Sequence, residues 1–398
     1  WTLDQVADYE QRGLWPKPTI LYDKELYAWG SNASGCLGLG NSVYYSSPVQ
    51  VGALTNWLKL AAGYSFSLAI KTDGTLWSWG YNSHGQLGDG TTVSKNSPIQ
   101  IGALTTWIQI TTGYSFSLAI KTDGTLWSFG RNLRGQLGDG TVVDKNSPIQ
   151  VGSLTTWAKV AAGGLFTAAT TTDGKLYAWG NGSQGQLGQG NDTRYSSPVQ
   201  VGALTNWLSI VAGYTTTYAL KTDGTLWAWG YNGLGCVGDG STTVRSSPVQ
   251  IGALTTWAKV GAGNYFGFGV KTDGTLWSWG WNNNGQLGDG TTTQRNSPVQ
   301  VGALTTWSNV TGGNGSTLST TTGGKLYAWG QNNQGQLGQG STSPNYSSPI
   351  QVGALTTWDT LATLGYGQSS YAITKTSAAL PLTYQVTVAN TGSGNKYY

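Results

Sequence analysis

A tryptophan followed by glycine recurs at a constant spacing of 50 residues along this sequence, and phenylalanine replaces the tryptophan once. The complete series is Trp29-Gly30, Trp79-Gly80, Phe129-Gly130, Trp179-Gly180, Trp229-Gly230, Trp279-Gly280 and Trp329-Gly330. A second tryptophan marks the same period at Trp57, Trp107, Trp157, Trp207, Trp257, Trp307 and Trp358, with one residue inserted near 343–346. Self-similarity at a fixed period of this length indicates one supersecondary unit repeated side by side, here seven times.

Each repeat contains four short runs that are rich in β-forming residues. In the repeat that begins at Trp57 they are 58–62, 66–72, 76–79 and 98–101. The Asp73-Gly74 pair between the second and third runs is typical of a type I′ hairpin, in which both central residues have positive φ. Proline opens the fourth run in every repeat. Since a sheet tolerates proline mainly at edges or first positions, we expect the fourth strand at the outer edge.

These observations predict an all-β fold, a seven-bladed β-propeller of four-stranded blades spanning residues 24–375. The first repeat opens at its third strand and the last ends after its second. We therefore expect the two ends to share one blade, with residues 24–51 paired to residues 358–375, because a ring leaves no exposed edges only if its ends interlock. Most of the 20 tryptophans are expected in the core between blades.

Two segments lie outside the repeats. Residues 1–23 are interpreted as a short helix over 2–12 and a linker, because Thr2 and Gln5 form a capping box and Gly13 and Pro16 follow. Residues 376–398 are interpreted as a linker and the start of a further β-module, since 383–388 alternate in polarity and 391–394 form a turn. The chain has no methionine, so we expect a processed or trimmed N-terminus and a native polypeptide that extends beyond Tyr398.

Composition argues against several classes of partner. The net charge of +4 is spread over 398 residues without a basic run, so nucleic acid is not an expected partner. The sequence has no apolar stretch of 18 residues, which predicts no membrane span. Cys36 and Cys236 occupy equivalent places four repeats apart. Those places are nearly opposite on a seven-fold ring, so the two cysteines are expected to be free thiols.

The residues needed for catalysis are sparse. His84 is the sole histidine and occupies a loop position that varies between repeats, where a solvated side chain is expected. The aspartates form two symmetric sets: Asp73, Asp123, Asp173, Asp223 and Asp273 in hairpin turns, and Asp89, Asp139, Asp239 and Asp289 in Gly-Asp-Gly loops. Glycoside hydrolysis needs two carboxyl groups within about 5–9.5 Å, whereas symmetry separates equivalent residues by whole blades. The sequence thus indicates no enzyme, no cofactor and no metal.

The repeats differ mainly on one side of the predicted ring. The loops after the first and third strands of each blade emerge together and form what we call the variable face; the other loops form the constant face, where Thr-Asp-Gly-Thr and Gly-Ala-Leu recur. We expect the variable face to contact a partner, although looser loop packing would also explain the variation. The candidate contact residues are Tyr64, Tyr81, His84, Tyr114, Arg131, Arg134, Tyr214, Tyr231, Tyr265 and Trp281.

The repeat resembles a known family. The run Trp79-Gly80-Tyr81-Asn82-Ser83-His84-Gly85-Gln86-Leu87-Gly88-Asp89-Gly90 is similar to the core of the regulator of chromosome condensation repeat, and the likeness covers 24–375. It implies a seven-bladed propeller. The eukaryotic founder of that family exchanges nucleotide on a small GTPase and binds chromatin, but fold does not carry function. Here Phe66, Phe116, Phe166, Thr216, Phe266 and Ser316 replace the family's usual histidine, and no basic tail is present.

Other segments favour a bacterial or bacteriophage branch of the family, because Leu-Thr-Thr-Trp and Lys-Thr-Asp-Gly-Thr resemble its linkers. Residues 1–16 resemble a leader of structural proteins of marine bacteriophages, and 384–398 resemble the opening hairpin of β-modules in such proteins. The hypothesis is a bacteriophage virion protein of a tail, fibre or capsid. Its propeller would attach to other virion proteins or to a host-surface glycan or protein, with oligomerisation possible through the N-terminal helix.

Three alternatives stay open. A secreted or surface adhesion protein of a bacterium would be extracellular and would show a signal peptide or anchor in the full gene. A nucleotide-exchange factor would capture small GTPases in a pulldown. A glycan-cleaving enzyme would degrade host polysaccharide.

Overall fold

The computed structural model describes residues 22–364 and 367–377, and the chain divides into two compact units. One unit is formed by Lys24–Lys375. The other combines Trp1–Asp23 with Thr376–Tyr398, and its described part is an antiparallel pairing of β1 (Tyr22–Asp23) with β31 (Thr376–Ser377). The predicted helix over 2–12 and the β-module predicted after residue 376 lie outside the described residues.

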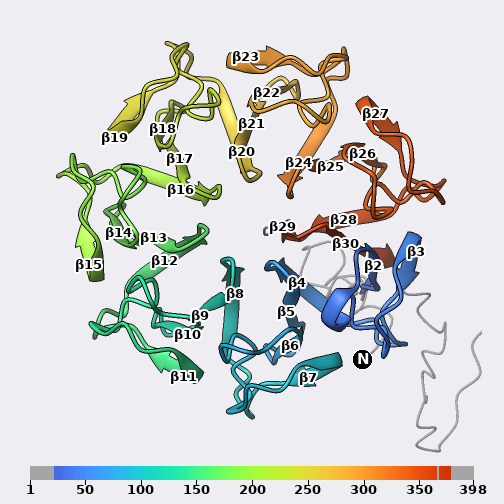
Figure 1. The fold of residues 1–398 in the computed structure, drawn as a ribbon, viewed down its shortest axis with the longest axis horizontal. Helices are drawn as coiled ribbons and strands as arrows, with labels where there is room; N and C mark the ends of the chain where they lie inside the picture. Colours follow the sequence, from blue (N-terminus) through green and yellow to red (C-terminus); the bar gives the residue numbers. More distant parts are fainter. Residues whose placement is uncertain (1–21, 365–366, 378–398) are drawn as a thin grey trace, which may run out of the picture. The chain divides into compact units, whose positions relative to one another are not determined.

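Residues 24–375 form seven blades of four antiparallel strands arranged as a ring, which confirms the predicted propeller (Figure 1). The sheet of blade 2 has a fifth short strand, β29 (Thr363–Leu364). Blade 1 contains β2 (Leu26–Gly30), β3 (Tyr45–Gln50), β28 (Trp358–Leu361) and β30 (Ser369–Thr374). Blade 2 contains β4 (Trp57–Ala62), β5 (Phe66–Lys71), β6 (Leu76–Gly80) and β7 (Lys95–Gln100); blade 3 contains β8 (Trp107–Thr112), β9 (Phe116–Lys121), β10 (Leu126–Gly130) and β11 (Lys145–Gln150).

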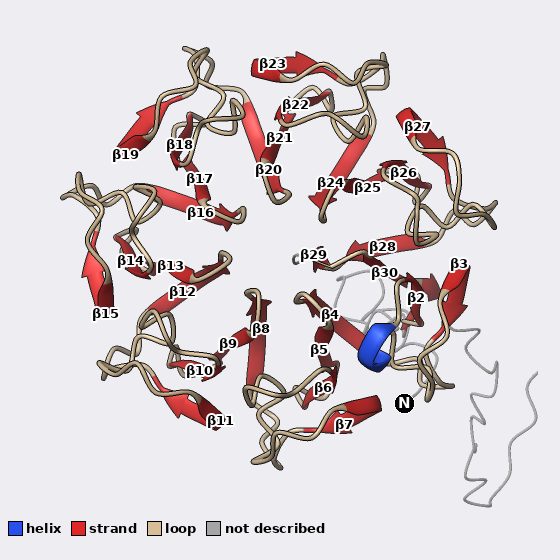
Figure 2. Ribbon diagram, viewed as in Figure 1, coloured by secondary structure: helices blue, strands red, loops and turns tan. Residues whose placement is uncertain are grey.

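The next four blades repeat this order. Blade 4 contains β12 (Trp157–Ala162), β13 (Phe166–Thr171), β14 (Leu176–Gly180) and β15 (Tyr195–Gln200); blade 5 contains β16 (Trp207–Ala212), β17 (Thr216–Lys221), β18 (Leu226–Gly230) and β19 (Arg245–Gln250). Blade 6 contains β20 (Trp257–Ala262), β21 (Phe266–Lys271), β22 (Leu276–Gly280) and β23 (Arg295–Gln300); blade 7 contains β24 (Trp307–Gly312), β25 (Ser316–Thr321), β26 (Leu326–Gly330) and β27 (Tyr346–Gln351). A short 3-10 helix, η1 (Ala33–Gly35), follows β2 and is coloured blue in Figure 2.

Blade 1 is shared between the two ends of the ring, as the sequence predicts. Its strand order is β28-β30-β2-β3, and β2 pairs antiparallel with β30, with Leu26 opposite Ile373 and Gly30 opposite Ser369. The last repeat therefore supplies the two inner strands and the first repeat the two outer ones. A short parallel pairing of β29 (Thr363–Leu364) with β4 adds a further link from blade 1 to blade 2.

The hairpin between the second and third strands differs from the predicted type I′ turn. Gly74 has a φ of 78°, but Asp73 is not among the described residues with positive φ. The N–H of Lys71 donates to the carbonyl of Thr75 at 3.1 Å, and the N–H of Gly74 donates to the carbonyl of Lys71 at 2.9 Å. The loop thus has three residues, and only its last one needs the left-handed conformation, as in hairpins that close with a glycine bulge.

The fourth strand lies at the outer edge of each sheet, as expected, but it begins earlier than predicted. β7 starts at Lys95, so Pro98 lies inside the strand and does not open it. The register shifts between Ser78 and Gly80, which pair with Ile99 and Lys95, respectively. The proline lies within this bulge of an edge strand, where the ladder needs no N–H from it.

The tryptophans of the repeat form the core between blades, as predicted. Trp57 and Trp79 are buried, with their ring centroids 6.0 Å apart. The indole N–H of Trp79 donates to the carbonyl of Cys36 in the preceding blade at 2.7 Å. Burying one indole contributes about 4–6 kcal/mol as an upper estimate, and the hydrogen bond sets its orientation across the blade boundary. Cys36 and Cys236 are free and buried, which confirms the expectation of free thiols.

Blades fall into two types that differ in a pair of residues, one at the end of the second strand and one in the third. In blade 2 the ammonium of Lys71 lies 3.5 Å from the ring centroid of Trp77, a close cation–π contact. Blades 3, 5 and 6 repeat this pair as Lys121–Trp127, Lys221–Trp227 and Lys271–Trp277. In blade 4 threonine and tyrosine, Thr171 and Tyr177, take the two places. Blades 7 and 1 follow blade 4 with Thr321 and Tyr327 and with Thr374 and Tyr27.

Candidate functional site

A belt of backbone hydrogen bonds joins neighbouring blades on the variable face. The N–H of Tyr64 donates to the carbonyl of Tyr114 at 3.3 Å, and Tyr114 donates in the same way to Gly164. The series continues from Gly164 to Tyr214 at 3.0 Å and from Tyr214 to Asn264 at 3.0 Å. Because the belt uses only main-chain groups, the fold places little constraint on these side chains.

Aromatic side chains on this belt form a continuous series that we call the aromatic arc. Tyr64 and Tyr114 stack with centroids 4.6 Å apart, Tyr114 meets Tyr214 edge-on at 6.4 Å, and Tyr214 meets Tyr265 at 5.7 Å. Tyr265 in turn contacts Tyr231 at 5.9 Å and Trp281 at 6.4 Å. The arc therefore brings together six of the ten predicted contact residues, from blades 2, 3, 5 and 6.

Gly164 lets the arc cross blade 4. A Cβ at this position would lie 2.8 Å from the ring of Tyr214, so any larger residue would displace that ring. The glycine occupies the place that tyrosine holds in blades 2, 3 and 5. The contact between Tyr114 and Tyr214 thus depends on a small residue between them.

One end of the arc borders a depression of about 670 Å³, which we call the Tyr64 depression. Five predicted contact residues line it: Tyr64, Tyr81, His84, Tyr114 and Arg131. Tyr214, Tyr231, Tyr265 and Trp281 belong to the arc but not to the depression, and Arg134 is exposed beyond its lining. The depression therefore brings together five of the ten predicted contact residues. The role of all ten in binding stays a prediction.

Sequence reasoning missed several residues that line the depression. Tyr44, Ser34 and Gln368 come from blade 1, the shared blade, and add one aromatic ring and two polar groups. Tyr44 precedes β3 at a place held by Ser94 and Asp144 in the next blades, so its variability could have marked it. Gln368 is equivalent to Ser65 and Ser115, because its carbonyl accepts the N–H of Ser31 as theirs accept those of Tyr81 and Arg131. The extra residues between Trp358 and Ser369 in the last repeat conceal this equivalence in the sequence.

His84 is more than a solvated loop residue. Its Nδ1 lies 3.0 Å from a carboxylate oxygen of Asp144 in the next blade. The other carboxylate oxygen of Asp144 accepts the backbone N–H of Asn132 at 2.7 Å. His84 is thereby held across the boundary between blades 2 and 3, at the edge of the Tyr64 depression.

Arg131 differs from His84 because its Nε is buried and has no hydrogen-bond partner among the described residues. It lies near the phenol of Tyr114, whose pKa is raised by burial and by the neighbouring tyrosines, while the guanidinium of Arg131 opposes that rise. Arg131 is thus the one permanently charged side chain among the described residues that line the depression.

Both sets of aspartates have structural roles within their own loops. Asp73 accepts the N–H of Thr75 at 3.0 Å and its hydroxyl at 2.7 Å, and these hydrogen bonds lower the pKa of Asp73. Asp89 accepts hydrogen bonds from Thr91 and Asn82 and lies 3.5 Å from the ammonium of Lys95. Within the described ranges, no cluster of histidine, cysteine and acidic side chains could hold a metal ion.

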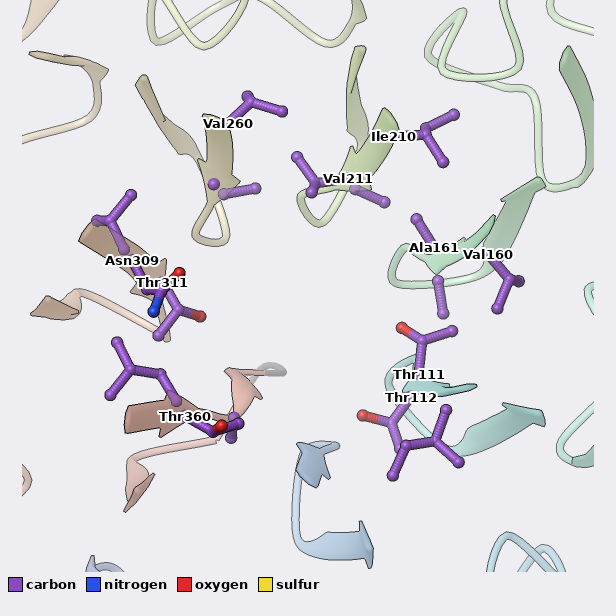
Figure 3. A pocket seen from close by; sticks show the side chains of 18 of the residues that line it. Thr111, Thr112, Val160, Ala161, Ile210, Val211, Val260, Asn309, Thr311 and Thr360 are labelled. Atoms are coloured by element: carbon purple, nitrogen blue, oxygen red, sulfur yellow. The ribbon is translucent and has the colours of Figure 1, made fainter. Parts of the chain in front are cut away.

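The central channel contains a second cavity, of about 330 Å³, lined by the innermost strands of six blades. Aliphatic side chains such as Val160, Ile210 and Val260 surround it (Figure 3). Asn309, Asp359 and four threonines, Thr111, Thr112, Thr311 and Thr360, add polar groups. The Tyr64 depression is the stronger candidate because it is larger and is lined by residues that vary between repeats. In the part of the chain that the structure describes, no helix is long and apolar enough to cross a membrane.

Known structures share this architecture. Prp20p from Saccharomyces cerevisiae is similar over 89% of this chain and 92% of its own, with 21% identity and a TM-score of 0.80. Human WBSCR16 is similar over 88% of this chain and 100% of its own, with 21% identity and a TM-score of 0.79. At these identities the likeness concerns the fold. No curated protein matches the sequence at a significant level.

The repeat itself identifies the family. The profile of the RCC1-like domain matches residues 19–258 and 104–382, which together span the whole ring of blades. Its extent agrees with the seven sheets and with the Trp-Gly-x-Asn-x-x-Gly-Gln-Leu-Gly motif, which recurs in the seven repeats with single or double substitutions in four of them. The chain therefore belongs to the family of RCC1-like domains.

Proposed function

We propose that this propeller is a non-enzymatic binding module that recognises its partner through the variable face. The observation that carries the proposal is the convergence of variable residues from different blades. Tyr64 and Tyr81 from blade 2 and Tyr114 and Arg131 from blade 3 border a single depression, and the aromatic arc extends this surface across the ring. Tyrosine, tryptophan and arginine supply contact area and directed hydrogen bonds at low entropy cost, as in known recognition surfaces.

Structural relatives support a protein as one class of partner. Prp20p has been studied for binding to Gsp1p and histones, and yeast RCC1 (Prp20) has been crystallised with Kap60. These relatives share the propeller with this chain. A rigid ring that displays loops from several blades is therefore compatible with protein recognition, and the residues on those loops decide the partner.

The biological setting that we propose is a bacteriophage virion, where the propeller serves as an attachment module on a tail, fibre or capsid. The support is the likeness of residues 1–16 and 384–398 to segments of marine bacteriophage structural proteins. An adhesion protein on a bacterial surface is the second candidate. The full-length gene and its neighbours distinguish the two, because an adhesion protein carries a signal peptide or anchor and a virion protein lies among structural genes.

The binding proposal can be tested by replacing Tyr81, Tyr231 and Trp281 together with alanine. Fluorescently labelled protein is incubated with a panel of marine bacteria and with arrays of their surface polysaccharides and proteins. We expect the variant to lose at least tenfold in attachment while its melting temperature changes by a few degrees at most, because these side chains lie on the surface of the ring.

The matched control replaces Leu154, Leu204 and Leu254, which are exposed on the constant face, and should attach normally. Attachment that survives the first substitution would overturn the proposal, and failure of the second variant would move the binding surface to the constant face. A pulldown with small GTPases tests the exchange-factor alternative, and incubation with the arrayed polysaccharides tests glycan cleavage.

A further inference from the structure

We propose that the Tyr64 depression binds an anionic saccharide, with the guanidinium of Arg131 holding the acidic group of the sugar. The inference rests on the proposed binding function and names its ligand class. It follows from three features of the depression: its charge, the chemistry of its lining and its size.

The depression holds one permanently charged side chain, a cation. Among the described lining residues Arg131 is that side chain, and the lining includes no aspartate or glutamate. Asp144 lies outside the lining, where it contacts His84 and accepts the N–H of Asn132. A cation at the wall of a cavity that forms no ion pair within the described residues favours an anion as its ligand.

Arg131 also differs from the other arginines whose partners are described. Arg245 and Arg295 lie 2.6 and 2.7 Å from Asp239 and Asp289, respectively, and Arg194 donates to the carbonyl of Leu133. Within the described residues no ion pair includes Arg131. The buried Nε is closed to a ligand. The terminal N–H groups of the guanidinium donate to no described residue in the hydrogen bonds of the structure, so an acidic group could accept from them.

The lining fits a ligand rich in hydroxyl groups better than an acidic peptide. Its side chains are mainly tyrosine rings and the hydroxyl and amide groups of Ser31, Ser65, Ser115, Asn314, Gln334 and Gln368. Ala33 is the one aliphatic side chain among the described lining residues. A peptide anchor would need an apolar pocket, whereas a sugar presents hydroxyls to polar groups and an apolar ring face to an aromatic side chain.

The exposed rings are placed to receive such a ligand. Tyr64 is 46% exposed although it stacks on Tyr114, so one side of the stacked pair is open to solvent. Tyr81 is 39% exposed on the same blade. A volume of about 670 Å³ lies within the usual range for small-ligand sites. It is sufficient for a short oligosaccharide whose acidic group reaches Arg131.

Isothermal titration of the full chain with defined oligosaccharides tests the inference. The probes are an oligogalacturonate, which carries carboxylates, a sulfated galactan oligosaccharide, a neutral oligosaccharide of equal length, and a short polyglutamate peptide. We expect one of the two acidic saccharides to bind and to weaken with added salt. Comparison of the oligogalacturonate with the sulfated oligosaccharide shows whether a carboxylate or a sulfate is the recognised group. The neutral sugar and the peptide should bind at least tenfold more weakly.

Variants of Arg131 identify the residue responsible. We expect Arg131→Gln to weaken binding of the acidic saccharide at least tenfold and Arg131→Lys to weaken it less, because lysine keeps the charge but loses the planar fork of donors. Arg194→Gln is the matched control, since it removes the same charge from an exposed arginine outside the depression and should bind normally. Melting temperatures show that each variant is folded.

Four outcomes would overturn the inference: no binding of either acidic saccharide, equal binding of neutral and acidic sugars, equal binding of polyglutamate, or no effect of Arg131→Gln. If the inference alone is wrong, the alanine substitutions of Tyr81, Tyr231 and Trp281 still abolish attachment to cells. If those substitutions also leave attachment intact, the binding function itself is wrong.

Discussion

Tyr64 stacks on Tyr114 with ring centroids 4.6 Å apart and planes inclined by 20°, although the two residues belong to different blades. The backbone bond from the N–H of Tyr64 to the carbonyl of Tyr114 holds them in register. The pair therefore joins two blades and also forms part of the candidate binding surface. Such an aromatic pair contributes about 0.5–1.5 kcal/mol to stability beyond its buried area. A substitution of either ring would therefore change both the candidate binding surface and the stability of the contact between blades.

The lysine–tryptophan pairs of the constant face should show measurable coupling. In blade 2, Lys71→Thr and Trp77→Tyr together reproduce the arrangement of blade 4. We expect the double variant to be more stable than the sum of the two single changes by about 1 kcal/mol, because each single change leaves one partner of the cation–π contact alone. Unfolding in guanidinium chloride of the parent, the two single variants and the double variant measures this coupling energy. Additive effects would show that the pairing contributes nothing.

Gly269 in blade 6 should not tolerate the alanine that its sequence equivalents contain. Ala69, Ala119, Ala169 and Ala219 are buried at this place in other blades. In blade 6 a Cβ would overlap the ring of Trp257, which is itself buried. We expect Gly269→Ala to destabilise the protein by about 1–3 kcal/mol, seen as a lower melting temperature. A more stable variant would mean that Trp257 relaxes without cost.

Acid should weaken the ring through the loop aspartates. Burial raises the pKa of Asp289, but hydrogen bonds from Thr291 and Arg295 outweigh it, so the pKa is lowered overall. A carboxyl group whose pKa is lowered by folding stabilises the protein above its unfolded pKa of about 3.9. This contribution is lost as the pH falls through the folded value.

We expect urea midpoints measured from pH 7 to pH 3 to decline less steeply in Asp289→Gln than in the parent. Gln189 and Gln339 occupy the equivalent place in blades 4 and 7, so glutamine is compatible with the loop. Parallel curves for the two proteins would rule out Asp289 as a source of the acid sensitivity.

Blade 1 should open before the other blades. Its two central strands, β30 and β2, come from opposite ends of the ring and have no hairpin between them, whereas β5 and β6 are joined by the four residues 72–75. We expect the amides of β2 and β30 to exchange with deuterium faster than those of β5 and β6 under native conditions. Equal protection in all blades would contradict this expectation.

The repeat made most of the fold predictable. Seven equally spaced aromatic-Gly steps, six of them Trp-Gly, predict the number of blades. The position of the repeat ends predicts the shared blade, in which Leu26 pairs with Ile373. The errors concern local geometry. Pro98 was expected to open its strand, but a bulge in β7 accommodates it three residues inside. The Asp73-Gly74 pair suits either hairpin type, and only the number of residues between the pairing strands distinguishes them.

The sequence predicts which face of the ring carries the candidate site, but not which residues on that face lie together. Variation between repeats marks Tyr64, Tyr114 and Tyr214 as surface residues, but it does not show that they contact one another. Those contacts arise from the closure of the ring and from the small size of Gly164. The pairing of Lys71 with Trp77 was visible as a coupled change between repeats, yet the sequence alone did not show that the two side chains touch.

The shared blade also determines how the ring would respond to mechanical force. The propeller begins at Lys24 and ends at Lys375, and these ends leave blade 1 side by side, since the N–H of Thr374 donates to the carbonyl of Glu25 at 3.0 Å. Tension between the flanking segments would therefore first separate β1 from β31 and then load the β2–β30 ladder from one end, so that its hydrogen bonds break one after another. The other six blades would carry almost no load until that ladder had opened.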